Sequence, residues 1–146
     1  MPKFERSMDI DANVEKVWEV ITKVDLWPHW FPGIDSVTNV SSVEAGGTFE
    51  WTGGGKTGTG VIGKVVPMKH LEVLTQMGDD KDSHVFELQP AGGFMGLGTN
   101  ECKVDYTLDT LMGGGILGNL VAAGNPMDTL RVSKALTMLR KFVESM

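Results

Sequence analysis

The stretch PMDTLRVSKALTMLRKFVESM, residues 126–146, decides the fold because its pattern predicts one long amphipathic helix. Asn125 and Pro126 form a start signal: an N-cap residue followed by proline at the first helical position, where the missing N–H costs nothing. Arg140 and Lys141 in the last turns suit the negative end of the helix dipole. At 1.5 Å per residue the helix would be roughly 30 Å long, enough to cross a small domain.

Placed at 100° per residue, this segment divides into an apolar and a polar half, so one face should be buried and the other should meet water. The apolar half holds Met127, Val132, Ala135, Leu136, Met138, Leu139, Phe142, Val143 and Met146. The polar half holds Thr129, Ser133, Lys134, Thr137, Arg140, Lys141 and Glu144. Asp128 and Arg131 interrupt the apolar half. Because charges are rarely buried unless paired or wet, either the first turns protrude past the core or this end borders a solvated cavity.

The N-terminal part of the chain predicts a strand and two short helical segments. Residues 4–11 alternate apolar and polar side chains, as a strand does. A helix follows, capped by Asp11 or Asn13, whose apolar side chains have i, i+3, i+4 and i+7 spacing: Val14, Val17, Trp18 and Ile21.

The run DLWPHWFPGI, residues 25–34, combines a cluster of three large aromatic residues with two prolines. Pro28 can begin a short helical turn, which the Pro32-Gly33 pair must end. Either at least one of Trp27, Trp30 and Phe31 sits at a pocket wall or surface patch, or the rings plug one end of the core.

From residue 34 onward the chain predicts six strands, at residues 34–40, 48–52, 57–66, 71–77, 83–88 and 101–110. The short turns between them permit hairpins and exclude crossover helices, so the sheet should be antiparallel. In the last strand the faces separate cleanly, with a wholly polar outer set and an inner set of Cys102, Val104, Tyr106 and Leu108. The predicted fold is α+β: a curved antiparallel sheet of about seven strands, in one domain over residues 1–146, wrapped around the C-terminal helix.

Two glycine-rich segments are candidates for covering a cavity. Residues 92–98 include Phe94, Met95 and Leu97 and could lie over a cavity mouth. Residues 113–125 place apolar side chains at helical spacing, but five glycines weaken them as a helix. We expect them to be either a hinged gate before Pro126 or a segment whose glycines permit close packing.

The run ERSMDIDANVEKVWEVITKVDLWPHWFPGIDSV, residues 5–37, resembles the opening of the START-like helix-grip superfamily, particularly its polyketide cyclase/dehydrase-like (SRPBCC) branch. The matching features are the Val17-Trp18 pair, the turn Trp27-Pro28-His29-Trp30, and the last helix with Leu136, Leu139 and Phe142. The resemblance implies an apolar cavity between the sheet and the last helix. It implies no particular catalytic residue, because members include cyclases, carriers, receptors and chaperone co-factors.

Composition excludes several functions. A net charge of −6 argues against nucleic acid as a partner and against docking on an anionic membrane. The longest weakly polar stretch, residues 111–124, is too short for stable membrane insertion. One cysteine, Cys102, and an N-terminus without an apolar signal region favour a cytoplasmic setting. GGGKTGTG, residues 53–60, lacks the first glycine of a phosphate loop and opens no helix, and the histidines have no metal-ligand spacing, so we expect neither cofactor nor metal.

A small hydrophobic molecule is the expected partner, bound by eight side chains: Trp30, Phe31, Phe49, Trp51, His84, Phe86, Tyr106 and Arg131. The alternative is an enzyme of the cyclase/dehydrase type using acid–base groups in the same cavity, for which His84, Tyr106 and Asp128 are weak catalytic candidates. Arg131 could orient a polar ligand head, with Asp128 as its partner at i, i+3. An enzyme needs at least two titratable groups converging on one cavity, whereas a carrier needs at most one orienting group.

Overall fold

The computed structural model describes residues 3–91, 101–112 and 126–146, and among these all side chains except those of residues 3, 111–112 and 126–129. The predictions for residues 92–98 and 113–125, and for the Asp128 side chain, lie outside this part. The elements are β1 (Lys3–Ile10), α1 (Val14–Thr22), the 3-10 helix η1 (Val24–His29), β2 (Ser36–Thr38), β3 (Thr48–Gly53), β4 (Lys56–Val66), β5 (His70–Met77), β6 (Asp80–Ala91), β7 (Glu101–Met112) and α3 (Pro126–Glu144).

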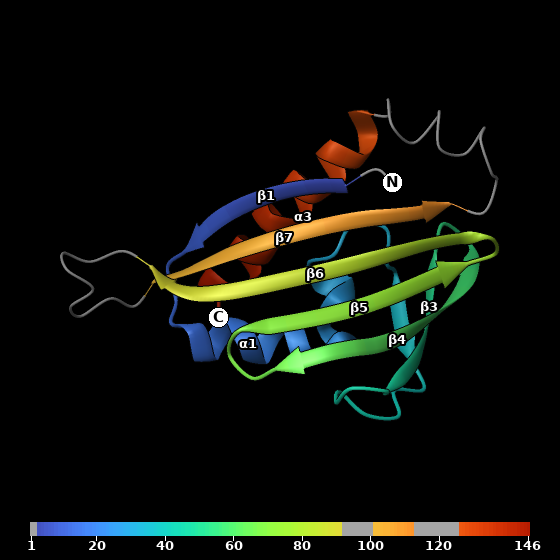
Figure 1. Cartoon of the computed structure of the whole chain (residues 1–146), viewed down its shortest axis with the longest axis horizontal. Coiled ribbons are helices and arrows are strands. Elements are labelled where there is room, and N and C mark those ends of the chain that lie inside the picture. Colours follow the sequence, from blue (N-terminus) through green and yellow to red (C-terminus); the bar gives the residue numbers. More distant parts are fainter. Residues whose placement is uncertain (1–2, 92–100, 113–125) are drawn as a thin grey trace.

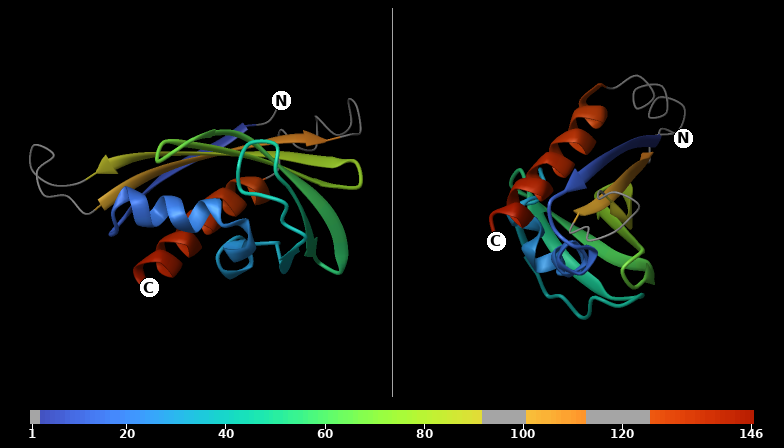
Figure 2. Two further views of the ribbon diagram at one scale, coloured as in Figure 1. Left: turned by 90° about the horizontal axis from the view of Figure 1, so that it is seen from below. Right: turned by 90° about the vertical axis from the view of Figure 1, so that its left-hand side faces the viewer.

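The seven strands form one sheet in the order β1-β7-β6-β5-β4-β3-β2, with every neighbouring pair antiparallel (Figure 1). The first strand pairs with the last, so the N-terminal strand closes one edge of the hairpin series. The helices α1 and α3 lie on the same side of the sheet, as Figure 2 shows. We call the side of the sheet that they cover the inner face. This arrangement confirms the predicted helix-grip fold.

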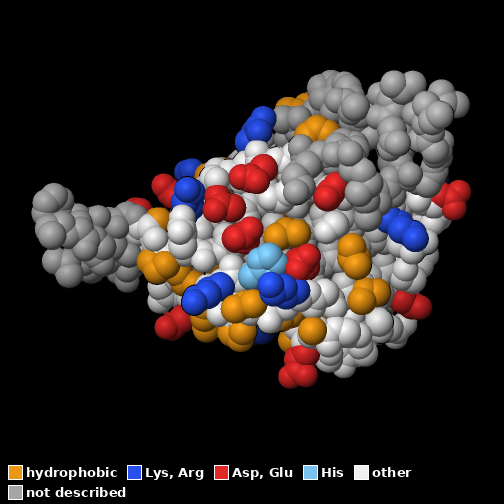
Figure 3. Space-filling view, viewed as in Figure 1, with side chains coloured by type: hydrophobic (Ala, Val, Ile, Leu, Met, Phe, Trp, Pro, Cys, Tyr) orange, Lys and Arg blue, Asp and Glu red, His pale blue; other side chains and the backbone are white. Residues whose placement is uncertain are grey.

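The inner face carries the core. Every second residue of the central strands is buried, and among them are Leu71, Val73, Phe86, Leu88, Val104 and Leu108. The outer face, seen in Figure 3, mixes acidic, basic and apolar side chains without a single dominant charge. Val61 and Leu74, paired across β4 and β5, are its more exposed apolar residues, at 41% and 43%. This face meets water, while the opposite one is enclosed.

The start of α1 follows its sequence signal. Asn13 is the N-cap, and its side-chain oxygen accepts a hydrogen bond from the backbone N–H of Lys16 at 2.8 Å. Asn13, and not Asp11, therefore fills the role that the sequence left open between the two. The helix then buries Val17, Trp18, Val20 and Ile21.

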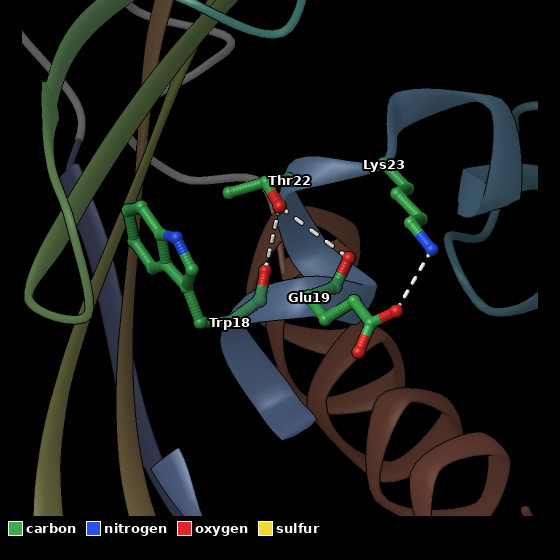
Figure 4. Close-up of polar contacts among 4 residues, drawn as sticks. All are labelled: Trp18, Glu19, Thr22 and Lys23. Atoms are coloured by element: carbon green, nitrogen blue, oxygen red, sulfur yellow. Dashed lines mark hydrogen bonds and ion pairs between the residues drawn. The ribbon is translucent and has the colours of Figure 1, made fainter. Parts of the chain in front are cut away.

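The end of α1 is fixed by local polar contacts, drawn in Figure 4. The hydroxyl of Thr22 donates to the carbonyl oxygen of Trp18 at 2.8 Å. Lys23 pairs with Glu19 one turn earlier at 2.9 Å. Both charged side chains are more than half exposed, so this pair contributes little stability. The pair lies where α1 ends and η1 begins.

The aromatic run after α1 is packed inward. The 3-10 helix begins at Val24, four residues before Pro28, because Leu26 N–H already closes a turn onto the carbonyl oxygen of Lys23 at 2.8 Å. Trp27, Trp30 and Phe31 are 0%, 1% and 6% exposed, so all three rings are buried at one end of the core, and Phe31 also forms part of a cavity wall.

Two glycines of β4 make room for the aromatic rings of β3. Phe49 faces Gly60 and Trp51 faces Gly58 across the strand pair. A Cβ atom on Gly60 would lie 2.1 Å from the ring of Phe49, and one on Gly58 would lie 2.6 Å from the ring of Trp51. Both aromatic side chains therefore lie over β4 and point along the inner face toward β5.

The buried stripe of α3 is narrower than the predicted apolar half. Val132, Ala135, Leu136, Leu139 and Val143 are at most 1% exposed. Met138 and Met146, expected inside, are 36% and 63% exposed. The physical reason is that α3 lies across β1 and β7 at one side of the sheet, so Met138 falls at the flank of the contact, and Met146 lies beyond the last turn.

Leu139→Ala should destabilise the protein by about 2–5 kcal/mol, because it leaves a cavity at a fully buried position. Thr137→Ala is the matched control on the exposed side of the same helix, with an expected change of less than about 0.5 kcal/mol. Urea unfolding of both variants measures the difference. Equal losses would mean that α3 presents another face to the sheet.

Candidate functional site

A row of polar side chains crosses the inner face of the sheet. Thr75 of β5 pairs with Asp82 of β6, and Asp82 pairs with Thr110 of β7. Thr75 and Thr110 are each 4% exposed, and each shares its strand face with buried apolar residues. His84 occupies the next inner position of β6 and is 1% exposed. The apolar inner face therefore becomes polar at the end where β5 ends and β6 begins.

His84 links two hydroxyl groups in a buried hydrogen-bond chain. Its Nε2 lies 2.9 Å from Thr75 Oγ1, and its Nδ1 lies 2.6 Å from Tyr106 Oη. All three side chains are almost fully enclosed. We call this set the Tyr106–His84–Thr75 chain. It crosses three neighbouring strands, so the sheet itself fixes the spacing of its members.

Aromatic side chains surround this hydrogen-bond chain. The imidazole of His84 meets the rings of Trp27 and Phe31 edge-on, with centroids 5.9 Å and 5.1 Å away. The phenol ring of Tyr106 stacks on Phe86 with centroids 4.5 Å apart. These neighbours exclude water and hold both rings in one orientation.

Burial keeps both titratable members of the chain uncharged. It lowers the pKa of His84 from 6.5 to about 3, and the nearby positive charge of Arg131 acts in the same direction. Burial also raises the pKa of the Tyr106 phenol far above its ordinary value. At neutral pH the set therefore consists of a neutral imidazole between two neutral hydroxyls.

Arg131 of α3 reaches the same end of the sheet. Its guanidinium lies 3.2 Å from a carboxylate oxygen of Asp82. The two side chains are 40% and 21% exposed, so the pair lies at the boundary between core and solvent. The sequence suggested Asp128 as the local partner of Arg131. The structure shows a pair with Asp82 of β6, and the pairing with Asp128 stays a prediction because that side chain lies outside the described part.

A cavity of about 180 Å³ opens where these groups meet. Its apolar walls come from the loop after η1 and from β3, and its polar wall comes from β5, β6 and α3. The lining residues are Phe31, Pro32, Gly33, Ile34, Trp51, Thr75, Asp82, His84 and Arg131. We take this cavity as the candidate site because a buried polar group and a charged pair face an aromatic wall inside it.

A larger hollow of about 740 Å³ lies at the other end of β6. It forms at the end of the sheet where β5 begins, because the last residues of β6, including Pro90, extend past β5 there, beside Val14 of α1. Exposed charged side chains such as Lys64, Lys69 and Glu87 line much of it. We do not assign the site here, because its polar groups are already solvated and impose no recognition geometry.

The eight predicted ligand-binding side chains divide into two sets. Four of them line the cavity, namely Phe31, Trp51, His84 and Arg131. The other four are buried around it, namely Trp30, Phe49, Phe86 and Tyr106. Of these, Tyr106 reaches the cavity only through His84.

Sequence reasoning missed three polar residues of this region: Thr75, Asp82 and Thr110. The signal was present in the alternation of the strands, because residues two apart lie on the same face of a sheet. Asp82 is two residues from the inward-facing His84, and Thr110 is four residues from the inward-facing Tyr106. Thr110 Oγ1 is also buried with no hydrogen-bond partner among the described residues. A polar residue at an inward position near a strand end is thus the feature that would have located the site.

Other chemistries find less support in the described part of the chain. Cys102 is fully buried, and burial raises the pKa of its thiol to about 11, which disfavours a nucleophilic thiolate. Among the residues that the structure places, no three His, Cys, Asp or Glu side chains gather as a metal site. None of the helices within the described ranges is both long and apolar enough to span a membrane.

Acidification should destabilise the protein through His84. Because the pKa of His84 is lowered in the folded state, the unfolded chain takes up a proton first as the pH falls below 6.5. Above pH 6.5 His84 is neutral in both states and does not change the free energy of unfolding. Between pH 6.5 and pH 3, the free energy of unfolding should fall with decreasing pH by about 1.4 kcal/mol per pH unit more in the wild type than in His84→Gln.

Urea unfolding of both proteins at several pH values measures this slope. His29→Gln, at an exposed histidine, is the control and should keep the wild-type slope. The assignment is wrong if His84→Gln and wild type lose stability in parallel.

The comparisons with known proteins agree with this fold. The solved structure of protein XoxI from Bacillus cereus has a TM-score of 0.74 at 15% identity, covering 99% of this chain and 96% of that one. The structure of TTHA0849 from Thermus thermophilus has a TM-score of 0.71 at 16% identity, covering 99% of this chain and 98% of that one. The di-domain ARO/CYC BexL from the BE-7585A biosynthetic pathway has a TM-score of 0.73 at 20% identity, covering 99% of this chain and 47% of that one. At these identities the likeness shows the fold alone.

No curated protein matches this chain. The family comparison is more decisive, because it covers nearly the whole sequence. The model of the family described as "Polyketide cyclase / dehydrase and lipid transport" matches residues 1–144. The chain belongs to the polyketide cyclase/dehydrase and lipid transport family.

Proposed function

We propose that this protein binds a small, mainly apolar molecule, of lipid, polyketide-like or aromatic character, in the cavity beside His84. One observation carries the proposal: the cavity joins an aromatic wall, Phe31 and Trp51, to a buried polar wall that includes Thr75 and His84. An apolar ligand body gains from the first wall, and the second fixes its orientation.

The size of the cavity limits the ligand. Its volume of about 180 Å³ is below the roughly 300–1,000 Å³ typical of drug-sized sites. The ligand is therefore a single substituted ring, or one end of a longer molecule that extends past Arg131.

The protonation states favour binding over acid–base catalysis. A general acid or base works best when its pKa is near the operating pH, whereas the pKa of His84 is about 3 and that of Tyr106 is raised by burial. The cavity wall can hold a hydrogen-bonding atom in place without exchanging charge with it. This is what an orienting group in a carrier or receptor needs.

A cyclase or dehydrase activity is the second candidate. It is favoured by the convergence of three titratable side chains, Asp82, His84 and Arg131, on one cavity. Such an activity would use hydrogen-bond donation to a carbonyl oxygen, since Asp82 and Arg131 neutralise each other. We place it second because burial keeps the imidazole of His84, which lines the cavity, uncharged at neutral pH.

The other expectations from the sequence remain predictions. The net charge of −6 still argues against a nucleic-acid partner, and the single cysteine still favours a cytoplasmic setting. Neither enters the argument for the cavity.

Acetophenone is a suitable probe, because it combines one aromatic ring with one polar atom. Titration followed by two-dimensional NMR should place the shifted amides around Thr75 and His84. Trp51→Leu removes one of the two rings of the aromatic wall and should weaken binding about tenfold. Trp18→Leu is the matched control, since Trp18 is a buried residue of α1 that does not line the cavity, and this variant should bind acetophenone as wild type does.

Two results would count against the proposal. The first is equal affinity in Trp51→Leu and Trp18→Leu. The second is a set of shifted amides at the hollow beside Pro90 instead of at Thr75.

A further inference from the structure

The direction of the hydrogen bonds in the Tyr106–His84–Thr75 chain carries a further consequence. A neutral imidazole has one N–H and one bare nitrogen, so His84 donates from one side and accepts on the other. Two arrangements satisfy the observed distances. In the first, Tyr106 donates to Nδ1, and Nε2–H donates to Thr75. In the second, Thr75 donates to Nε2, and Nδ1–H donates to Tyr106.

Burial decides between these arrangements. In the second, the hydroxyl hydrogen of Tyr106 would have no acceptor among the described residues, and Tyr106 is 1% exposed. An unpaired donor that deep in the core is costly, since water cannot reach it. In the first arrangement every hydrogen of Tyr106 and His84 is bonded. The hydrogen left over belongs to Thr75, and Thr75 lines the cavity.

We propose that Thr75 is the specificity-determining hydrogen-bond donor of the cavity, and that Tyr106 acts as a positioning residue that fixes this role through His84. The inference rests on the proposed binding function. It adds the class of ligand: an apolar molecule whose buried end carries an oxygen that accepts a hydrogen bond, as a ketone, aldehyde or ester does.

The charges around the cavity favour an uncharged acceptor. Arg131 is already bonded to Asp82 at 3.2 Å, so the pair adds no net charge. His84 is neutral, and aromatic rings form the opposite wall. A carboxylate placed beside Thr75 would lose its hydration and would be repelled by the nearby carboxylate of Asp82. An uncharged carbonyl oxygen avoids both the desolvation of a charge and this repulsion.

The first test needs no ligand. The ¹⁵N spectrum of the histidine ring shows which nitrogen of His84 carries the hydrogen. We expect Nε2–H in the wild type. In Tyr106→Phe, which keeps the ring and removes the donor to Nδ1, the Nδ1–H form should become measurably populated. Nδ1–H in the wild type, or pure Nε2–H in Tyr106→Phe, would overturn the role given to Tyr106.

The second test compares acetophenone with ethylbenzene, which has the same shape but no oxygen. Thr75→Val keeps the size of the side chain and removes the hydroxyl. It should weaken acetophenone binding about 3- to 10-fold, as expected for one net hydrogen bond, and change ethylbenzene binding less than about twofold. Thr75→Ser restores the hydroxyl and should restore acetophenone affinity. Tyr106→Phe should weaken acetophenone binding more than ethylbenzene binding, although Tyr106 contacts His84 and does not line the cavity.

The outcomes separate this inference from the proposed function. If both compounds bind but Thr75→Val weakens them equally, the donor role of Thr75 is overturned and the binding function stands. If neither compound binds to the wild type, the proposed function is overturned, and the role of Thr75 in recognition with it. The tautomer of His84 is measured without ligand in the wild type and in Tyr106→Phe. It therefore still tests the direction of the hydrogen bonds in the Tyr106–His84–Thr75 chain if Thr75→Val does not fold.

Discussion

A side chain on the covered face of this sheet must be apolar or must find a polar partner, because α1, η1 and α3 exclude water from it. The rest of the molecule follows from this constraint. Leu71, Val73, Phe86 and Leu108 satisfy it by being apolar. His84 satisfies it with one hydrogen bond on each side, to Tyr106 and Thr75. Burial keeps the imidazole neutral, and a neutral imidazole makes both bonds by donating from one nitrogen and accepting at the other.

The same constraint explains why the site lies at one end of the sheet. Along β6 the inward residues change from Leu88 and Phe86 to His84 and Asp82, so the apolar lining gives way to polar groups. Asp82 is near enough to the boundary to meet Arg131 of α3, and both remain partly exposed. In the proposed binding mode, a ligand entering at this end would meet the partly exposed Arg131–Asp82 pair before the buried Thr75. Such a gradient orients an amphipathic molecule without a covalent step.

Most of the fold could be predicted from the sequence because its elements carry local signals. Strand alternation, the Asn13 cap and the apolar stripe of α3 each depend on a few adjacent residues. Met138 was misplaced because a helical wheel gives the direction of the apolar face but not the width of the surface that covers it. That width depends on where α3 crosses β1 and β7, which is a property of the whole sheet.

The site was less predictable, since its members meet through strand pairing. Aromatic side chains at inward positions could be named, but their separation into cavity wall and core depends on how Phe49 and Trp51 lie over Gly60 and Gly58. Asp82 precedes the strand predicted at residues 83–88, and only its pairing with Thr110 places it on the inner face. Register across three strands is not encoded in any one of them.

The central claim is that the cavity between Trp51 and His84 is where a ligand binds, with its polar atom at Thr75. A crystal structure of the protein soaked with acetophenone tests it directly. We predict the phenyl ring against Phe31 and Trp51, and the carbonyl oxygen within hydrogen-bond distance of Thr75 Oγ1. Acetophenone found only in the hollow beside Pro90, or on the outer face at Val61 and Leu74, with this cavity empty, would contradict the claim.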